Sequence, residues 1–141
     1  MNLQFAVATQ RDIPVIFAQA KALIDTYEDI STIDYEKVIA WVERKISQNI
    51  SQYRTALKDG KTCAYYCLRD DGELDDFYVL PLFQNMGIGS EIMRKCIAES
   101  EKTLYLYVFN RNIRAISFYE RFGFTVRQTV GKTRMIMHRN G

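Results

Sequence analysis

The sequence predicts an α/β (α+β) fold, a mixed and mostly antiparallel sheet of about seven strands flanked by four helices. Two Asp-Gly turns, Asp59-Gly60 and Asp71-Gly72, separate three β-rich runs in the middle of the chain. Apolar residues recur at helical spacing on both sides of these runs. A glycine-rich turn then joins the third run to a helix. We expect one domain, residues 1–141, in the order β-α-α-β-β-β-α-β-α-β-β.

The first third of the chain predicts one strand and two helices. The strand is expected from Leu3 to Ala8. Thr9 to Asp12 resembles a capping box, and Pro14 suits a first helical turn. Helical spacing then continues through Ile16, Phe17, Ala20, Leu23, Ile24 and Tyr27. After an interruption at Ser31-Thr32, a second helix is expected through Tyr35, Val38, Trp41, Val42 and Ile46.

The remaining elements follow from turns and apolar runs. A meander is expected over Tyr53 to Leu57, Thr62 to Leu68 and Leu74 to Leu82. A third helix, Ile88 to Ala98, follows the glycine turn, and the apolar run Leu104 to Phe109 is typical of a central strand. A fourth helix from Asn112 to Phe122 stops at Gly123. The last hairpin pairs Phe124 to Val130 with Arg134 to His138, and Gly131-Lys132-Thr133 forms its turn.

Composition narrows the functional class. The chain has 141 residues, 48% hydrophobic and 26% charged, with a net charge of +2. Dedicated nucleic-acid binders usually carry a larger basic excess. No apolar run approaches the roughly 20 residues of a membrane span, and Met1 to Phe5 lacks the pattern of a signal peptide. We therefore expect a cytoplasmic protein with no nucleic-acid or membrane partner, and its state, monomer or homodimer, is left open.

Cysteine and histidine usage does not predict a metal site. Cys63 and Cys67 are four residues apart on one expected strand, roughly 13 Å, which is too far for a disulfide. Together with Cys96 and the single histidine, His138, they form none of the usual zinc spacings. Free thiols suit a reducing compartment.

The most informative stretch is Gln84-Asn85-Met86-Gly87-Ile88-Gly89-Ser90, between a strand and a helix. Unpaired N–H groups in a first helical turn attract anions, and glycines allow a phosphate to approach the backbone. A dinucleotide fingerprint would need a third glycine where Ile92 stands. A P-loop ending in Gly131-Lys132-Thr133 would need glycine where Val126 stands. The stretch predicts a cradle for a different phosphorylated ligand.

Two motifs resemble those of the GCN5-related N-acetyltransferase (GNAT) family. Gln84-x-x-Gly87-x-Gly89 is similar to the family's pyrophosphate loop, Gln/Arg-x-x-Gly-x-Gly/Ala. The run from Asn112 to Phe124 is similar to its second signature, Asn-x-x-Ala-x-x-Phe-Tyr-x-x-x-Gly-Phe. The resemblance implies an acyl-CoA N-acyltransferase fold in which the fourth and fifth strands splay apart around acetyl-CoA.

The resemblance also implies site residues. Backbone N–H groups from Gln84 through Asn85, Met86, Gly87, Ile88 and Gly89 to Ser90 would bind the pyrophosphate of acetyl-CoA. The backbones of Phe77, Val79 and Leu80 would pair with pantetheine, and the Phe77 N–H would lie near the acetyl carbonyl. Tyr119 would act as the catalytic acid at the CoA sulfur, or only pack its ring. Asn112 would contact the cofactor, cap a helix, or do both.

The acceptor side is less defined. Counted back from Gln84, Glu73 matches the family's glutamate base; Asp75, Asp76 or a water are alternatives, and the three carboxylates also suit a solvated strand entrance. The acceptor would be a primary amine of a small molecule or a peptide, with Tyr27, Asp34, Tyr35 and Trp41 as candidate pocket residues. Arg111, Arg114, Arg121 and Arg127 suit either an anionic cofactor or a solvated helix face.

Two functions compete with an acetyltransferase. A non-catalytic module that binds CoA would keep the cradle without turnover, and CoA consumption with a panel of amines separates the two. A nucleic-acid module would use the four arginines, and its binding to polyanions would weaken steeply with salt.

Overall fold

The computed structural model describes residues 2–140 and has the expected order of elements. The strands are β1 (Leu3–Val7), β2 (Tyr53–Lys58), β3 (Lys61–Leu68), β4 (Leu74–Val79), β5 (Leu104–Phe109), β6 (Thr125–Val130) and β7 (Arg134–Arg139). The helices are α1 (Ile13–Tyr27), α2 (Tyr35–Gln48), α3 (Ile88–Glu99) and α4 (Ile113–Arg121), and short 3₁₀ turns join several elements. The predicted fold class is confirmed.

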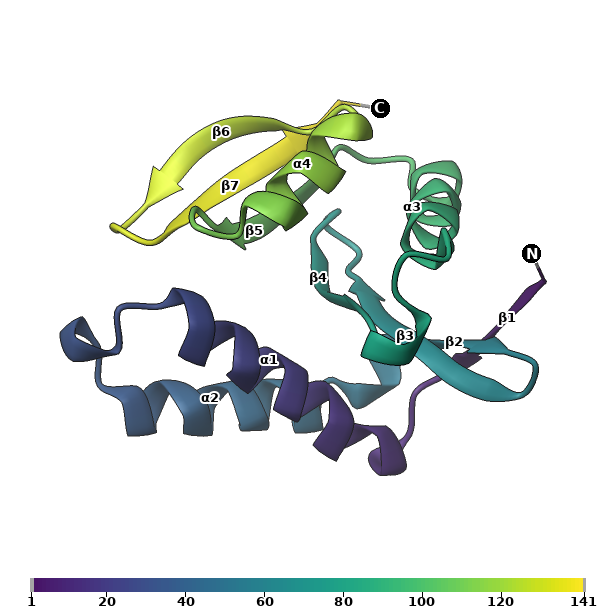
Figure 1. Cartoon of the computed structure of the whole chain (residues 1–141), viewed down its shortest axis with the longest axis horizontal. Coiled ribbons are helices and arrows are strands. Elements are labelled where there is room, and N and C mark those ends of the chain that lie inside the picture. Colours follow the sequence, from purple (N-terminus) through teal and green to yellow (C-terminus); the bar gives the residue numbers. More distant parts are fainter. Residues whose placement is uncertain (1, 141) are drawn as a thin grey trace.

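The expected splay appears as a break between two antiparallel sheets. One sheet has the order β1-β2-β3-β4 and the other β5-β7-β6. In the described part of the chain, one parallel bridge, Glu73 to Tyr105, joins them where β4 and β5 begin. There the Tyr105 N–H donates to the Gly72 carbonyl over 3.1 Å. Beyond the bridge no ladder joins the two strands among residues 2–140, so the sheets separate towards their far ends (Figure 1).

Glycine is required at the closed end of this gap. Gly72 has φ +98°, which side chains rarely adopt, and a Cβ added there would lie 2.2 Å from the Thr103 carbonyl oxygen. The two backbones therefore meet at a distance that only glycine permits. This contact fixes where β4 and β5 converge.

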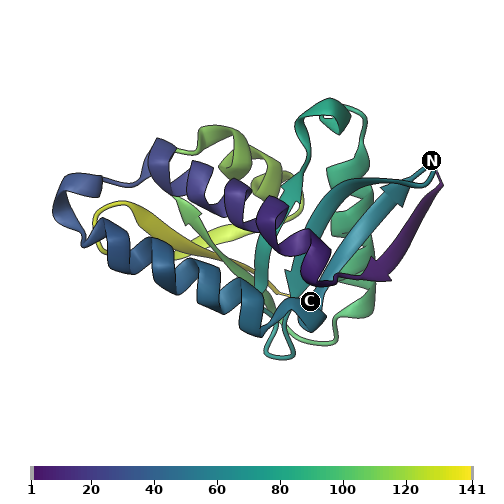
Figure 2. The same ribbon diagram turned by 90° about the horizontal axis from the view of Figure 1, so that it is seen from below.

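Two apolar clusters hold the layers together. One lies between the four-stranded sheet and the helices α1 and α2, which run side by side in Figure 2, and includes Ile16, Ile46, Tyr53 and Tyr65. The other contains α3 residues and residues of both sheets, such as Ile92, Leu106 and Met137, and α4 packs against it. The second cluster contains side chains from both sheets, so apolar packing holds the two sheets together where no backbone ladder joins them.

The conformational preferences of individual residues explain where most helices and strands begin and end. The Asp59-Gly60 turn has positive φ at both residues, as a tight hairpin requires. The Thr9 capping box is present, Gly123 ends the fourth helix at φ +88°, and Gly131 turns the last hairpin. The expectation that β4 reaches Leu82 is wrong: the strand ends at Val79 and a 3₁₀ turn follows from Pro81, because proline has no N–H for a ladder.

Two further observations concern the cysteines and the length of the helices. The three cysteines, Cys63, Cys67 and Cys96, are buried and free. None of the helices in residues 2–140 combines the length and hydropathy needed to cross a membrane.

Candidate active site

The glycine turn before α3 presents a run of free backbone donors. Six consecutive N–H groups, from Asn85 to Ser90, have no hydrogen-bond acceptor in the part of the chain that the structure describes. The first intrahelical bond comes one residue later, from the Glu91 N–H to the Gly87 carbonyl. Asn85 and Gly87 have φ of +63° and +81°, which turns the backbone into a concave loop. The loop therefore has the geometry of an anion site at a helix N-terminus.

Two side chains shape this loop from outside. The Gln84 amide donates to the Val79 carbonyl over 3.0 Å, which ties the loop to the end of β4. Arg114, on α4, donates to the Asn85 side-chain oxygen over 2.8 Å, and its guanidinium brings positive charge to the loop. The other three arginines lie elsewhere: Arg111 binds the Tyr27 carbonyl, Arg121 covers the Phe118 ring and Arg127 lies beside His138.

The free edge of β4 faces the gap. The Leu80 N–H donates to the Cys63 carbonyl of β3, so the peptide groups of Phe77 and Val79 point the other way, towards β5. The Leu80 carbonyl accepts from Phe83. Leu80 thus uses both of its backbone groups within the protein. Phe77 and Val79 turn theirs to the side where, within residues 2–140, β4 has no strand partner beyond Glu73. On that side the Val79 carbonyl accepts from the Gln84 amide.

Helix α4 packs aromatic side chains against β4 beside the gap. The Asn112 side chain accepts from the Ala115 N–H, which confirms its interpretation as a helix cap. Phe118 packs edge-on against Phe77 across the gap, with ring centroids 6.1 Å apart. Tyr119 packs on Phe118 and Phe124, and burial, with a smaller effect of the Asp75 carboxylate, raises its pKa to about 12. The Tyr119 phenol is therefore protonated at neutral pH.

A β-bulge turns two consecutive carboxylates to one face of β4. The register between β3 and β4 shifts after Tyr65, and Asp76 has φ +47°. In a regular strand Asp75 and Asp76 would point to opposite faces. Here both reach Lys45 of α2, whose Nζ lies 3.0 Å from Asp75 and 3.3 Å from Asp76. The bulge thus brings Asp75 and Asp76 together against α2.

These carboxylates belong to a half-buried ionic network. Arg69 lies 3.0 Å from Asp75 and 3.7 Å from Glu73, and the Tyr53 hydroxyl donates to Asp76. Burial, with help from Asp75, raises the pKa of Asp76 and of Glu73. Although burial opposes it, contact with Lys45 and Arg69 holds the pKa of Asp75 below its usual value. Two cations, Lys45 and Arg69, thus contact three carboxyl groups.

Replacing Lys45 with methionine is expected to destabilise the fold by about 2 kcal/mol at pH 7. This is below the roughly 3–5 kcal/mol for breaking a fully buried pair, because the Lys45 side chain is 19% exposed. The lowered pKa of Asp75 adds stability that is present above its unfolded pKa of about 3.9 and is lost below it. The difference in melting temperature from the unmodified protein should therefore persist from pH 7 to about 4 and shrink as the pH falls further, through the lowered pKa of Asp75.

Thermal unfolding followed by circular dichroism at several pH values measures this effect. Lys37→Met is the control, because the Lys37 side chain is 86% exposed and its contact with Asp34 is 3.8 Å long. Equal melting temperatures for Lys45→Met and Lys37→Met at pH 7 would show that the network adds no stability.

Sequence reasoning missed Lys45, Tyr53, Arg69 and Asp76 as one group, although it named Asp76 as an alternative base. The pair Asp75-Asp76 inside a strand was the available signal, since aspartate is disfavoured there. The proposed acceptor residues also lie apart. Tyr27 stacks on Phe109, Tyr35 donates to Asp25, and Trp41 is exposed beside Lys45. None of these, nor Asp34, lines the cleft between α1 and β4.

Comparisons with known proteins agree with this geometry. A sequence model described as "Acetyltransferase (GNAT) family" matches residues 19–124. The spermine/spermidine N(1)-acetyltransferase of Bacillus subtilis (strain 168) is 36% identical over 56 residues, which are 36% of this chain and 37% of that protein. The match therefore spans little more than a third of this relative.

Solved structures of similar fold cover the whole chain. PaiA N-acetyltransferase from Thermoplasma acidophilum, in complex with coenzyme A, aligns over 100% of both chains with TM-score 0.69 and 19% identity. An acetyltransferase from Thermus thermophilus aligns over 100% of this chain and 98% of its own, with TM-score 0.71 and 20% identity. At these identities the likeness concerns the fold.

Proposed function

Because the chain belongs to the GNAT acetyltransferase family, we propose that it moves the acetyl group of acetyl-CoA to a primary amine by direct attack in a ternary complex. The observation that carries the proposal is the run of free N–H groups from Asn85 to Ser90, beside the open end of the gap between β4 and β5. A pyrophosphate would accept these donors at the positive end of α3. The nearby guanidinium of Arg114 favours the same anion.

Pantetheine would extend from the loop along β4. Its amides would pair with the peptide groups of Phe77 and with the Val79 N–H, as an added strand pairs with a sheet edge, while the Val79 carbonyl stays bound to Gln84. The backbone of Leu80 is engaged within the protein, so its part would be limited to supporting the strand. The Phe77 N–H would donate to the acetyl carbonyl as negative charge develops on its oxygen. Asn112, which caps α4, would fix that helix at the cofactor's side.

Tyr119 would assist the departing thiolate. Its phenol carries a proton at neutral pH, since burial raises its pKa to about 12, and it can donate that proton or a hydrogen bond to the CoA sulfur. Glu73 would remove the proton from the attacking amine, and Asp75, Asp76 or an ordered water are the alternatives.

Tyr119→Phe is expected to lower the rate of acetyl transfer about 100-fold and to leave acetyl-CoA affinity nearly unchanged. This loss lies at the lower end for general acid catalysis, because a thiolate is a modest base. An interaction made only in the transition state changes turnover and not binding. The loss should shrink with an acyl donor whose leaving thiol is more acidic.

Single-turnover kinetics, in which chemistry limits the rate, provides the measurement. Tyr107→Phe serves as the control, because the Tyr107 side chain is exposed on β5. Equal rates for Tyr119→Phe and the unmodified protein would remove the hydroxyl from the mechanism and leave Tyr119 as a packing residue.

Two observations suggest which acceptors to test: the charge of the carboxylate cluster and the name of the Bacillus subtilis relative. The three carboxyl groups of Glu73, Asp75 and Asp76 favour an acceptor that is a cationic amine over one that is an anion. The name of the Bacillus subtilis relative makes spermine and spermidine the first acceptors to test, beside simple amines and peptides with free amino groups. Mass spectrometry of these mixtures with acetyl-CoA identifies the product. CoA binding without any acetylated product would favour the alternative, a non-catalytic CoA-binding module.

A further inference from the structure

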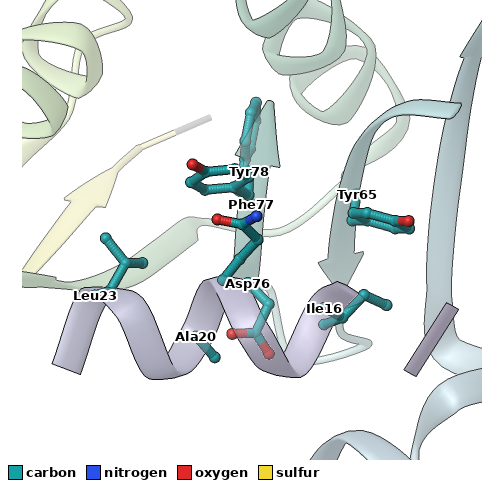
Figure 3. Close-up of a pocket in the computed structure, with 8 residues that line it drawn as sticks. Ile16, Ala20, Leu23, Tyr65, Asp76, Phe77 and Tyr78 are labelled. Carbon is teal, nitrogen blue, oxygen red and sulfur yellow. The ribbon is translucent and has the colours of Figure 1, made fainter. Parts of the chain in front are cut away.

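Two pockets among the described residues differ greatly in size. The cleft between α1 and β4, where Figure 3 shows Asp76 directed at α1 beside Ala20, holds about 20 Å³, which is room for about one water. A groove between β1 and the last turns of α3 holds about 280 Å³. The smallest sites for organic ligands have volumes of about 300 Å³. Of the two, the groove therefore has room for a small organic molecule.

The pairing of three strands builds the floor of this groove. Val7, Arg54 and Tyr66 are direct neighbours on β1, β2 and β3, and such cross-strand neighbours point to the same face of a sheet. That face packs against α3, whereas α1 and α2 pack on the other face (Figure 1). Lys95 and Glu99, near the end of α3, form the opposite wall. The groove thus lies towards the C-terminal end of α3, and the loop of free N–H groups lies at its N-terminal end.

The guanidinium of Arg54 is held in place and keeps a free edge. Its Nη1 donates to the carbonyls of Ser51 and Tyr53, over 3.0 Å and 3.1 Å. Within residues 2–140, Nε and Nη2 have no acceptor and the guanidinium has no carboxylate partner. Parallel N–H groups on one edge of a guanidinium match the two oxygens of a carboxylate. Because the two carbonyls already orient Arg54, a ligand would order it at little further cost in entropy.

The Tyr66 hydroxyl is a second unpaired donor. Tyr66 is only 4% exposed, yet its hydroxyl makes no hydrogen bond in the part of the chain that the structure describes. It is not one of the fully buried atoms that lack a partner, so it reaches solvent in the groove. Burial, with smaller effects of Cys96 and Glu99, raises the pKa of Tyr66, although Arg54 opposes the rise. The phenol therefore keeps its proton at neutral pH and can donate a hydrogen bond to an anion.

The charges around the two donors match a single negative charge. Arg54 and Lys95 are cations and Glu99 is an anion, so the lining of the groove carries a net charge of +1. Lys95 pairs with Glu99 and also lies over the Phe5 ring, 4.8 Å from its centroid. A carboxylate would neutralise the remaining charge of Arg54, whereas a doubly charged phosphate would leave one negative charge unbalanced.

We propose that this groove is a binding site for a small monocarboxylate with a short apolar body. The carboxylate contacts the Nε and Nη2 groups of Arg54 and the hydroxyl of Tyr66. The apolar body lies against Phe5 and Val7, whose side chain is 53% exposed in the free protein. The site does not depend on the proposed transferase function, because none of these residues belongs to the loop, the gap or the carboxylate cluster.

Binding of benzoate to the free protein, followed residue by residue in an NMR titration, tests this proposal. Benzoate should shift the amide signals of Val7, Arg54 and Tyr66. Benzamide has the same shape and no charge, and it should bind at least about tenfold more weakly, the effect of losing hydrogen bonds to a charged group. Tighter binding of inorganic phosphate than of benzoate at the same residues would overturn the choice of a carboxylate.

Two substitutions test the two donors. Arg54→Gln should raise the dissociation constant of benzoate at least about tenfold. Arg44→Gln is its control and should leave the constant unchanged, because Arg44 is exposed on α2, on the other face of the sheet. Tyr66→Phe removes only the unpaired hydroxyl, so the free protein should keep its stability while the constant rises about tenfold. This variant tests the site even where Arg54→Gln loosens the turn at Ser51.

A third substitution should act in the opposite direction. Glu99→Gln removes the negative charge of the groove and releases Lys95 from its ion pair. Benzoate should then bind about two- to fivefold more tightly, the range for one charge interaction at a surface. Weaker binding in Glu99→Gln would contradict the charge argument and overturn the assignment.

Further outcomes decide whether the groove is a separate site. Absence of benzoate shifts in the groove, an unchanged constant in folded Arg54→Gln and in Tyr66→Phe, or an equal loss in Arg44→Gln would each overturn the proposal. Loss of the Arg54-dependent binding when CoA is added would mean that the cofactor occupies the groove. An unchanged benzoate constant in the presence of CoA supports a separate site, and it does so whether or not the protein yields an acetylated product.

Discussion

Replacing Glu73 with glutamine is expected to lower turnover about 100- to 10,000-fold at pH 7, the usual contribution of a general base. The side chain lies at the closed end of the gap, 20% exposed and 3.7 Å from Arg69. Glutamine keeps the size of the side chain and removes its ability to accept a proton. The acceptor then has to lose its proton to solvent before attack.

The pH profile separates a base from a surface charge. Activity of the unmodified protein should fall as the pH drops through the pKa of Glu73, and burial, then Asp75, raises that pKa above an ordinary glutamate. Glu73→Gln should lose this acidic limb and recover part of its rate at high pH, where more amine is unprotonated. Glu43→Gln, on the exposed side of α2, is the control. A loss below about tenfold at every pH would exclude Glu73 as the base, and Asp75 would be tested next.

Ser90→Glu is expected to weaken CoA binding at least about 100-fold without destabilising the free protein. Ser90 is the third residue of α3, where a carboxylate interacts favourably with the helix dipole. The same carboxylate would occupy the loop of free N–H groups and repel a pyrophosphate. Ser90→Glu is easier to interpret than Gly89→Val. A Cβ added at Gly89 would lie 3.5 Å from the Phe118 ring, so the larger valine side chain would also change the packing.

Thermal shift provides the readout. With CoA at about 100 times its dissociation constant, the unmodified protein should gain about 2.7 kcal/mol, equivalent to roughly 8–10 °C for a domain of this size. A 100-fold weaker Ser90→Glu should gain about 0.4 kcal/mol, or roughly 1–2 °C. Ser90→Gln, with the same length and no charge, should retain most of the shift. An equal CoA shift in Ser90→Glu and the unmodified protein would exclude the loop as the phosphate site.

Local chemistry made much of the fold predictable from the sequence. Residues that act through their own backbone were identified correctly: the Asp59-Gly60 turn, the Asn112 cap and the Gly123 stop all lie where their conformational preferences put them. The free N–H groups around Gly87 follow from the same kind of information, because a left-handed residue before a helix leaves the first turn open.

The ionic network could not be predicted in the same way. Asp75 and Asp76 share a face because of a bulge in the pairing of β4 with β3, and alternation along a strand predicts the opposite. Their partner Lys45 lies 30 residues earlier on another element. Arg114 meets Asn85 from a helix 29 residues away. Such contacts depend on tertiary packing, which no spacing along the chain encodes.

The break between the sheets also bears on aggregation. The β5 segment, Leu-Tyr-Leu-Tyr-Val-Phe, has no charge, no proline and high β-propensity, the composition of a segment that stacks into cross-β assemblies. One of its edges pairs with β7, and the other is unpaired along most of its length in the described part of the chain, residues 2–140. That free edge faces β4 inside the molecule, so the opposite sheet shields it from other chains. Substitutions that widen the gap, such as a side chain at Gly72, would therefore endanger solubility as well as the site.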